Sequence, residues 1–195
     1  MIPRALATSV ALLLVLAGGP SRGEEDPHRQ AVEQLIQWGA QIQTQKDPTG
    51  GSGEVMISTD GRWRGGDQGL RLLASVDGLW KLRLAGKISD AGLRHLAEVP
   101  NLRSLDLHLP GVTDAGVAHL GALTDLRRLN LTYTKTTDAG LEPLAGLKNL
   151  QWLGLIYTRV TKAGVAKLQR ALPDTVIEGD FSGAGNEGKR MSEEG

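Results

Sequence analysis

Apolar residues in the middle of the chain follow two spacings that alternate. In the first, leucines such as Leu105 and Leu107 lie two residues apart with a polar residue between them. This period of two predicts a short strand with one buried face. In the second, apolar residues such as Val117, Leu120 and Leu123 lie three residues apart, which predicts a short helix packed against the strand.

The two spacings together form a unit that recurs along the chain. Its clearest copies begin with Ser89, Thr113 and Thr137, each followed by Asp-Ala-Gly. Weaker copies around Asp67 and Lys162 extend the series, with steps of 23, 24, 24 and 24 residues between the equivalent Asp or Lys positions. Self-similarity at this period predicts a stacked repeat architecture. Because one unit cannot offset its ordering entropy of roughly 1–2 kcal/mol per residue, it depends on its neighbours.

Written as a consensus, the unit is L-x-x-L-x-L-x-x-T-x-V-T-D-A-G-L-x-x-L-x-x-L-x-x. It resembles the leucine-rich repeat family, in the ribonuclease-inhibitor-like and cysteine-containing-like subgroup of the bacterial secreted type. The resemblance covers residues 67–177. It implies an α/β fold, a leucine-rich repeat solenoid (horseshoe) with a parallel concave sheet and short helices on the convex side. Thr134 and Thr158 stand where many members have Asn or Cys, so we expect hydroxyl groups to hold these turns.

Each predicted helix opens with a hydroxyl residue that can cap it, followed in most units by an acid that suits its positive end. These acids are Asp67, Asp90, Asp114 and Asp138. We assign them to structure rather than to calcium binding, because the sequence lacks the Gly-rich repeat of calcium-binding β-rolls. Pro143 follows a first helical turn, where it removes a backbone hydrogen bond and predicts a looser, 3₁₀-like turn.

The beginning of the chain lies outside the repeats and has the pattern of a targeting segment. Residues 1–23 are typical of a secretory signal peptide, with Arg4, an apolar run and a small-residue exit at 21–23. The run is too short to span a membrane comfortably, and an uncleaved anchor is the alternative. We therefore expect a secreted, periplasmic or cell-envelope protein with no stable membrane insertion after cleavage.

The remaining chain divides into three predicted parts. Residues 24–66 form an N-terminal cap, residues 67–181 the repeats with a C-terminal strand, and residues 182–195 a disordered tail. In the cap, Asp26 and Pro27 open an amphipathic helix that covers the end of the stack. A loop over 46–53, a strand over 54–58 and a further loop with Trp63 follow. The sequence leaves Trp63 either exposed or buried.

Charge and cysteine content limit the classes of partner and of site that the protein can have. The chain has 22 basic and 22 acidic side chains, and loss of Arg4 and Arg22 with the signal peptide leaves 20 and 22. This balance argues against nucleic acid as the main partner. Without cysteine, the chain has no disulfide, thiol nucleophile or cysteine-bound zinc. We expect a monomer with no cofactor.

The candidates for catalysis and metal binding are weak. Ser104, Asp106 and His108 are triad residue types, but the serine and histidine lie roughly 13 Å apart along one strand, with the carboxylate between them. His95 and His119 occupy equivalent helix positions about 8–10 Å apart, too far for an easily shared ion. An enzyme with a site in the loop over 39–66 is a rival interpretation, although that loop has no histidine. We predict no catalytic or metal-binding residues.

The outward positions of the predicted strands form a candidate binding face. Its strongest feature is the pair Trp152 and Ile156 on either side of Gly154, which presents apolar surface on a sheet. The predicted contact residues are Arg83, Asp106, His108, Arg128, Asn130, Trp152 and Ile156.

Strands in register would also set particular residues side by side. Arg83 would pair with Asp106, and Glu54 with Lys81. In the last strand, Asp174 would lie beside Trp152.

These observations predict a non-enzymatic scaffold that binds a protein of unknown identity through the concave face. An inhibitor or regulator of a partner enzyme is one alternative, and a structural cell-envelope protein is another. A solvated polar face without a ligand is the simplest explanation of the same residues. Replacing Trp152 separates these interpretations, because only a binding face would lose its partner.

Overall fold

The computed structural model describes residues 26–45 and 54–181. The predicted signal peptide, the loop over 46–53 and the predicted disordered tail lie outside these residues. Seven strands form one sheet in the order of the chain. They are β1 (Gln41–Gln45), β2 (Glu54–Ser58), β3 (Leu79–Ala85), β4 (Ser104–His108), β5 (Arg128–Asn130), β6 (Trp152–Gly154) and β7 (Val176–Glu178).

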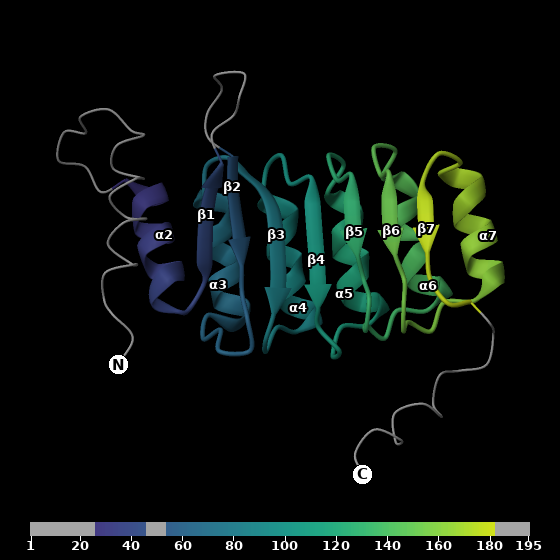
Figure 1. Cartoon of the computed structure of the whole chain (residues 1–195), viewed down its shortest axis with the longest axis horizontal. Coiled ribbons are helices and arrows are strands. Elements are labelled where there is room, and N and C mark those ends of the chain that lie inside the picture. Colours follow the sequence, from purple (N-terminus) through teal and green to yellow (C-terminus); the bar gives the residue numbers. More distant parts are fainter. Residues whose placement is uncertain (1–25, 46–53, 182–195) are drawn as a thin grey trace, which may run out of the picture.

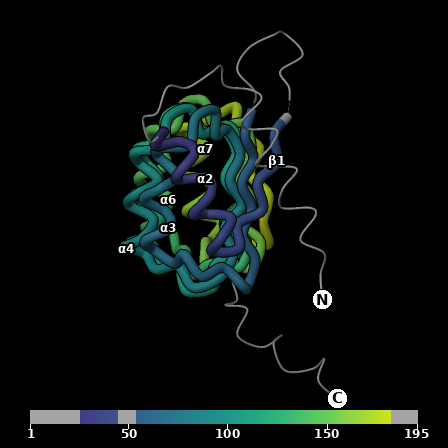
Figure 2. The backbone as a smooth tube through the Cα atoms, turned by 90° about the vertical axis from the view of Figure 1, so that its left-hand side faces the viewer, coloured from purple at the N-terminus to yellow at the C-terminus, as the bar shows by residue number. Residues whose placement is uncertain are grey.

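The molecule has two layers, a sheet and a row of helices. Strands β2 to β7 are parallel, and β1 pairs antiparallel with β2. Figure 1 shows the strands side by side with the helices behind them, and the end view in Figure 2 separates the two layers. The fold is therefore the predicted α/β leucine-rich repeat solenoid, with one antiparallel strand added at its N-terminal end.

One helix precedes the first strand, and short helical segments connect β2 to β7. They are α2 (Pro27–Gln37), α3 (Gly66–Leu72), η1 (Leu73–Ser75), α4 (Asp90–Leu93), η2 (Arg94–Glu98), α5 (Asp114–Ala118), η3 (His119–Ala122), α6 (Asp138–Leu141), η4 (Pro143–Gly146) and α7 (Lys162–Ala171), where η marks a 3₁₀ turn. The 3₁₀ turn predicted at Pro143 is confirmed. Three earlier repeats make the same turn without proline, so the turn belongs to the repeat rather than to Pro143.

Leucines from the strands fill the space between the layers. The eight residues at the predicted inward positions are each at most 1 % exposed: Leu82, Leu84, Leu105, Leu107, Leu129, Leu131, Leu153 and Leu155. Leu96, Leu120 and Leu144 close the core from the helical side and are fully buried. Since burying one such side chain contributes roughly 1.5–3 kcal/mol, this core accounts for the stability of the stack.

Helix α2 covers the N-terminal end of the stack, as predicted. The Asp26 side chain accepts a hydrogen bond from the backbone N–H of His28, and Leu35 is buried in the core. Trp63 is buried as well, in edge-to-face contact with Trp38 at 6.3 Å between ring centroids. The loop with Trp63 therefore belongs to the cap and offers no exposed aromatic side chain at that residue.

The repeats are joined by a carboxylate ladder at the starts of the helices. Asp114 accepts two hydrogen bonds from Thr137 in the next repeat, from its backbone N–H at 2.7 Å and its hydroxyl at 2.6 Å. Three further pairs form the same two bonds: Asp67 with Ser89, Asp90 with Thr113 and Asp138 with Thr161. The acids have a structural role, as expected. From the sequence we expected each acid to stabilise the start of its own helix, and the structure adds its hydrogen bonds to the next repeat.

The glycine of each Asp-Ala-Gly triplet makes room for this ladder. A Cβ atom at Gly140 would lie 2.4 Å from Oδ1 of Asp114, and Gly92, Gly116 and Gly164 are placed in the same way. The last unit has Lys162 in place of the acid. In the part of the chain that the structure describes, no further repeat follows that could donate to an acid at that position.

The predicted strand register is correct in the middle of the sheet and wrong at its two ends. Lys81 lies beside Met56 rather than Glu54, because β2 pairs with β3 two residues further along than the predicted register. At the other end, Val176 rather than Asp174 lies beside Trp152, a step of 24 residues (176 minus 152) that keeps the repeat period.

Candidate functional site

The sheet face, defined as the outward positions of β2 to β7, brings the predicted contact residues onto one surface. Ser104, Arg128, Trp152 and Val176 form one row across the strands. The next row contains Arg83, Asp106, Asn130, Gly154 and Glu178. His108 and Ile156 lie beyond these rows toward the ends of their strands, and both are exposed. The register therefore confirms that these residues share a face, whereas their role in binding stays a prediction.

The predicted pair of Arg83 and Asp106 is present. The Arg83 guanidinium approaches one carboxylate oxygen of Asp106 through two nitrogens, each at 3.4 Å. The arginine side chain is 53 % exposed, so solvent screens the pair and its contribution to stability is within about 1 kcal/mol. Glu54, predicted to pair with Lys81, instead approaches Arg103 at 3.8 Å.

Trp152 lies flat on the sheet instead of projecting from it. A Cβ atom at Gly154 would lie 2.5 Å from the indole, so glycine is needed beneath the ring. The guanidinium of Arg128 lies 4.5 Å from the centroid of the indole, in a cation–π contact. The tryptophan is partly exposed and is held in one orientation from two sides, so it has little conformational freedom left to lose.

Asn130 is more constrained than the sequence suggested. Its side-chain oxygen accepts a hydrogen bond from the backbone N–H of Thr132 at 3.0 Å, which leaves the amide nitrogen as the group available to a ligand. The residue thus fixes the turn after β5 as well as contributing to the face.

Two tyrosines that sequence reasoning missed extend the apolar surface beyond the sheet face. Tyr133 and Tyr157 follow β5 and β6, and their rings stack at 4.7 Å between centroids with an interplanar angle of 17°. They are 54 % and 47 % exposed, and Ile156 beside them is 39 % exposed. We call these three residues the tyrosine ledge. The backbone N–H of Tyr133 donates to the carbonyl of Ile156, which joins the ledge to the sheet.

The backbone of the tyrosine ledge is unusual. Tyr133 and Tyr157 have φ angles of +64° and +55°, a left-handed conformation that costs a bulky residue about 1–2 kcal/mol. The hydroxyls of Thr134 and Thr158 donate to carbonyls three residues back and hold these turns, as predicted. The equivalent residue of the first repeat is Gly86, at φ +114°, which has no such cost.

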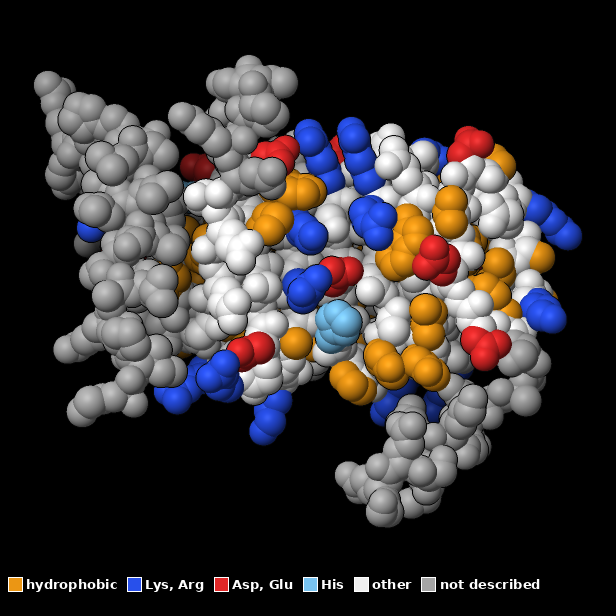
Figure 3. Space-filling view, in the orientation of Figure 1, with side chains coloured by type: hydrophobic (Ala, Val, Ile, Leu, Met, Phe, Trp, Pro, Cys, Tyr) orange, Lys and Arg blue, Asp and Glu red, His pale blue; other side chains and the backbone are white. Residues whose placement is uncertain are grey.

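Cationic side chains gather on the same surface, near the starts of the strands. Five lie on β3, on β5 or directly before β4 and β5: Lys81, Arg83, Arg103, Arg127 and Arg128. Figure 3 shows blue side chains over the upper middle of the strands and hydrophobic side chains over the lower ends of β5 and β6. Among the described residues, Lys81, Arg127 and Arg128 form no ion pair. We call these five residues the cationic cluster.

Comparisons with known proteins add little to this geometry. No protein-family model and no curated protein sequence matches the chain. One similar solved structure is an internalin from Listeria monocytogenes, with 25% sequence identity and a TM-score of 0.42 over 55% of this chain and 29% of that chain. Another is the LRR ectodomain of the receptor kinase SOBIR1 from Arabidopsis thaliana, with 16% identity and a TM-score of 0.44 over 80% and 97% of the two chains. The chain thus spans less than a third of the length of the internalin. Its resemblance to the ribonuclease-inhibitor-like subgroup stays a prediction.

The residue types of a catalytic triad on β4 are not connected to one another. Ser104 is buried, and Asp106 contacts Arg83. In the described ranges, no hydrogen bond joins Ser104 to His108. Within residues 26–45 and 54–181, no group of three or more His, Asp or Glu side chains could hold a metal ion. In those same ranges, every helix is too short or too polar to cross a membrane.

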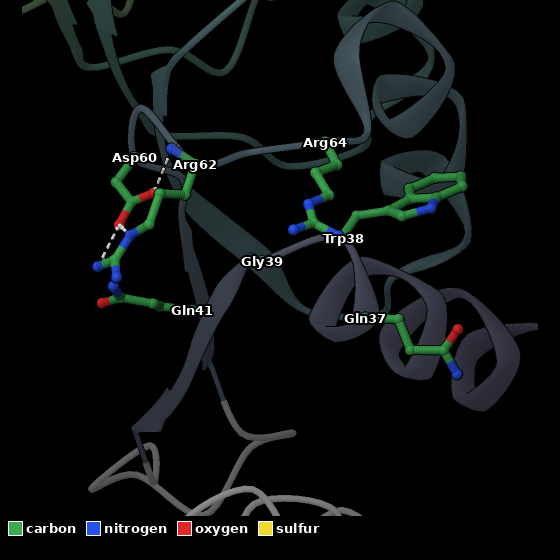
Figure 4. Close-up of a pocket in the computed structure, with 7 residues that line it drawn as sticks. All are labelled: Gln37, Trp38, Gly39, Gln41, Asp60, Arg62 and Arg64. Carbon is green, nitrogen blue, oxygen red and sulfur yellow. Dashed lines mark hydrogen bonds and ion pairs between the residues drawn. The ribbon is translucent and has the colours of Figure 1, made fainter. Parts of the chain in front are cut away.

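A hollow of about 370 Å³ lies in the N-terminal cap, between the end of α2 and the loop after β2. Figure 4 shows Asp60 and Arg62 on one side of it and Trp38 and Arg64 on the other. The backbone N–H of Arg62 donates to Asp60 and lowers the pKa of that carboxyl. Among the described lining residues there is no serine, threonine or histidine, and the one carboxyl group, that of Asp60, is paired with Arg62. Lys46 and Asp47, in the loop over 46–53, lie outside the described residues.

Proposed function

We propose that this protein is a non-enzymatic scaffold that binds a partner protein on its sheet face. The observation that carries the proposal is the indole of Trp152, fixed between Gly154 and Arg128 on the same face as the exposed Ile156. Aromatic and arginine side chains that are already ordered contribute most to protein interfaces, because little entropy is lost when they are covered. Secretion, a bacterial source and a monomeric state belong to the same proposal.

The predicted contact residues have distinct roles in this interface. Trp152 and Ile156 supply apolar area, and Arg128 keeps the indole in place while presenting charge. Arg83, Asp106 and His108 lie on the neighbouring strands β3 and β4, where polar groups orient a partner more than they hold it. Asn130 donates from its amide nitrogen.

The experiment is affinity capture with the full chain from cells that produce it, beside two variants. The first combines Trp152→Ala with Arg128→Ala, and the control combines Arg71→Ala with Arg94→Ala, two exposed arginines on the helical side. We expect one partner to be retained by the wild type and the control and reduced at least tenfold by the first variant. Equal retention by all three proteins would contradict the proposal. An enzyme that is captured and loses activity would make the chain an inhibitor.

A further inference from the structure

The chemistry of the sheet face specifies the kind of segment that would occupy it. This inference rests on the proposed function and concerns the same surface. The cationic cluster has five positive side chains, whereas the acids facing it are Glu54 and Asp106, and each of these already contacts an arginine. The cluster therefore has an excess of three positive charges on a chain whose formal net charge is zero.

The tyrosine ledge supplies an anchor of a different kind on the same surface. Its two rings occupy a backbone conformation that glycine occupies in the first repeat, and strain of this kind persists where function uses it. The equivalent residue after β4 is Leu109, which is buried and has no positive φ angle. Among the repeats that the structure describes, exposed tyrosine rings thus occur at this position in two.

The two features lie at opposite ends of β5, with Arg127 and Arg128 at its start and Tyr133 after its end. From Arg128 to Thr132 the chain advances four residues, which in extended conformation is roughly 13 Å. An extended peptide that runs along β5 and β6 covers this distance with about four residues of its own. Its carboxylates would then meet the cationic cluster while one large apolar side chain reaches the ledge.

We propose that the occupant is an extended acidic segment of a partner protein, with carboxylates on Lys81, Arg127 and Arg128 and an apolar side chain on the tyrosine ledge. The segment carries its acids and its apolar residue about three to five positions apart. Charge complementarity sets its orientation, because the reversed segment would bring its acids to the tyrosine ledge and away from the cations.

The test is selection of a random dodecapeptide library, displayed on phage, against the immobilised full chain. We expect the selected peptides to be acidic and to contain an aromatic or large aliphatic residue three to five positions from an acid. Synthetic copies should bind at least tenfold more weakly at 500 mM than at 50 mM sodium chloride, because the contacts are exposed and screened. Selected peptides without an acidic bias would overturn the inference.

Variants assign the two contacts separately. Lys81→Glu with Arg127→Glu should weaken peptide binding at least tenfold, whereas Arg71→Glu with Arg94→Glu, which changes the net charge equally on the helical side, should not. Tyr133→Asn with Tyr157→Asn keeps residues that tolerate positive φ and should cause a similar loss. Equal losses in the two charge-reversal variants, or no loss with the asparagines, would also overturn the inference.

Two further outcomes separate this inference from its rivals. A single-stranded DNA dodecamer that binds more tightly than the peptides, and through the same cations, would make the surface a nucleic-acid site and contradict the inference. Peptides that need Trp152 but carry no acids would overturn this inference alone. Peptides indifferent to Trp152→Ala, or no enrichment at all, would count against the proposed function too.

Discussion

The helical side and the sheet face belong to the same repeats, yet they use equivalent positions in opposite ways. At the helix starts, an acid, a hydroxyl residue and a glycine recur because each has the same part in the ladder. The acid accepts from the hydroxyl residue of the next repeat, and the glycine of that next repeat leaves room for the acid. On the sheet face, one row holds a serine, an arginine, a tryptophan and a valine. The core beneath this row is leucine from β4 to β6 and does not require such variety. The constant side therefore holds the stack together, and the variable side is the one that can recognise something.

The largest effect should come from adding one methyl group to the constant side. Gly140→Ala places a Cβ atom 2.4 Å from the Asp114 carboxylate, which must move and give up its two bonds to Thr137. We expect a loss of about 1–3 kcal/mol in the free energy of unfolding, measured by denaturant titration. The control is Gly146→Ala, where a Cβ atom meets nothing within 4 Å. A Gly140→Ala protein as stable as this control would show that the ladder does not hold the repeats.

A smaller effect on stability, with a large effect on binding, should come from the variable side. Tyr133→Gly with Tyr157→Gly removes the left-handed strain of about 1–2 kcal/mol per residue, but also removes ring contacts and adds chain entropy. These terms oppose one another, so thermal unfolding should change little while the affinity for an acidic peptide falls at least tenfold. Leu109→Gly, the buried equivalent, should instead destabilise the protein by about 3 kcal/mol. A loss of stability as large as that of Leu109→Gly would show that the two tyrosines are part of the core and would contradict this prediction.

The smallest effect should come from completing the ladder where it ends. Lys162→Asp restores the repeated acid in the last unit, but the described chain offers no following hydroxyl to bond it. We expect the thermal midpoint to stay unchanged, whereas Asp138→Lys, the same exchange one repeat earlier, should lower it by several degrees. A clear gain in stability from Lys162→Asp would show that the acid acts mainly on its own helix.

The sequence was sufficient for the repeated part of the fold. Alternating leucines and the 24-residue period fixed the strands, their order and the inward residues, because each unit must match its neighbours. Strand β1 was missed, since Gln41–Gln45 is polar apart from Ile42 and lies outside the repeats. The register failed at both ends for a related reason. Asp174 was placed beside Trp152, although the 24-residue period itself places Val176 there.

The candidate site was predictable only in part. The period placed Arg83, Asp106, Arg128 and Trp152 on one surface, but it could not show that the indole lies flat over Gly154. The tyrosine ledge was missed because residues in turns do not follow the spacing of buried residues. Tyrosine, unlike glycine, also does not indicate a positive φ angle in a sequence. One signal was available: Tyr133 and Tyr157 stand 24 residues apart, at the position that holds Gly86 in an earlier unit.

Because the carboxylate ladder joins each repeat only to its neighbours, the distance across the sheet face comes in fixed increments. Duplicating one unit between β4 and β5 would move Arg83 away from Trp152 by one strand spacing, about 4.8 Å, and would leave every bond in the ladder of the same kind. Losing one unit would shorten the distance equally. Distances across the sheet face can therefore change only in steps of one strand spacing. A partner that spans the face would have to match a whole number of repeats.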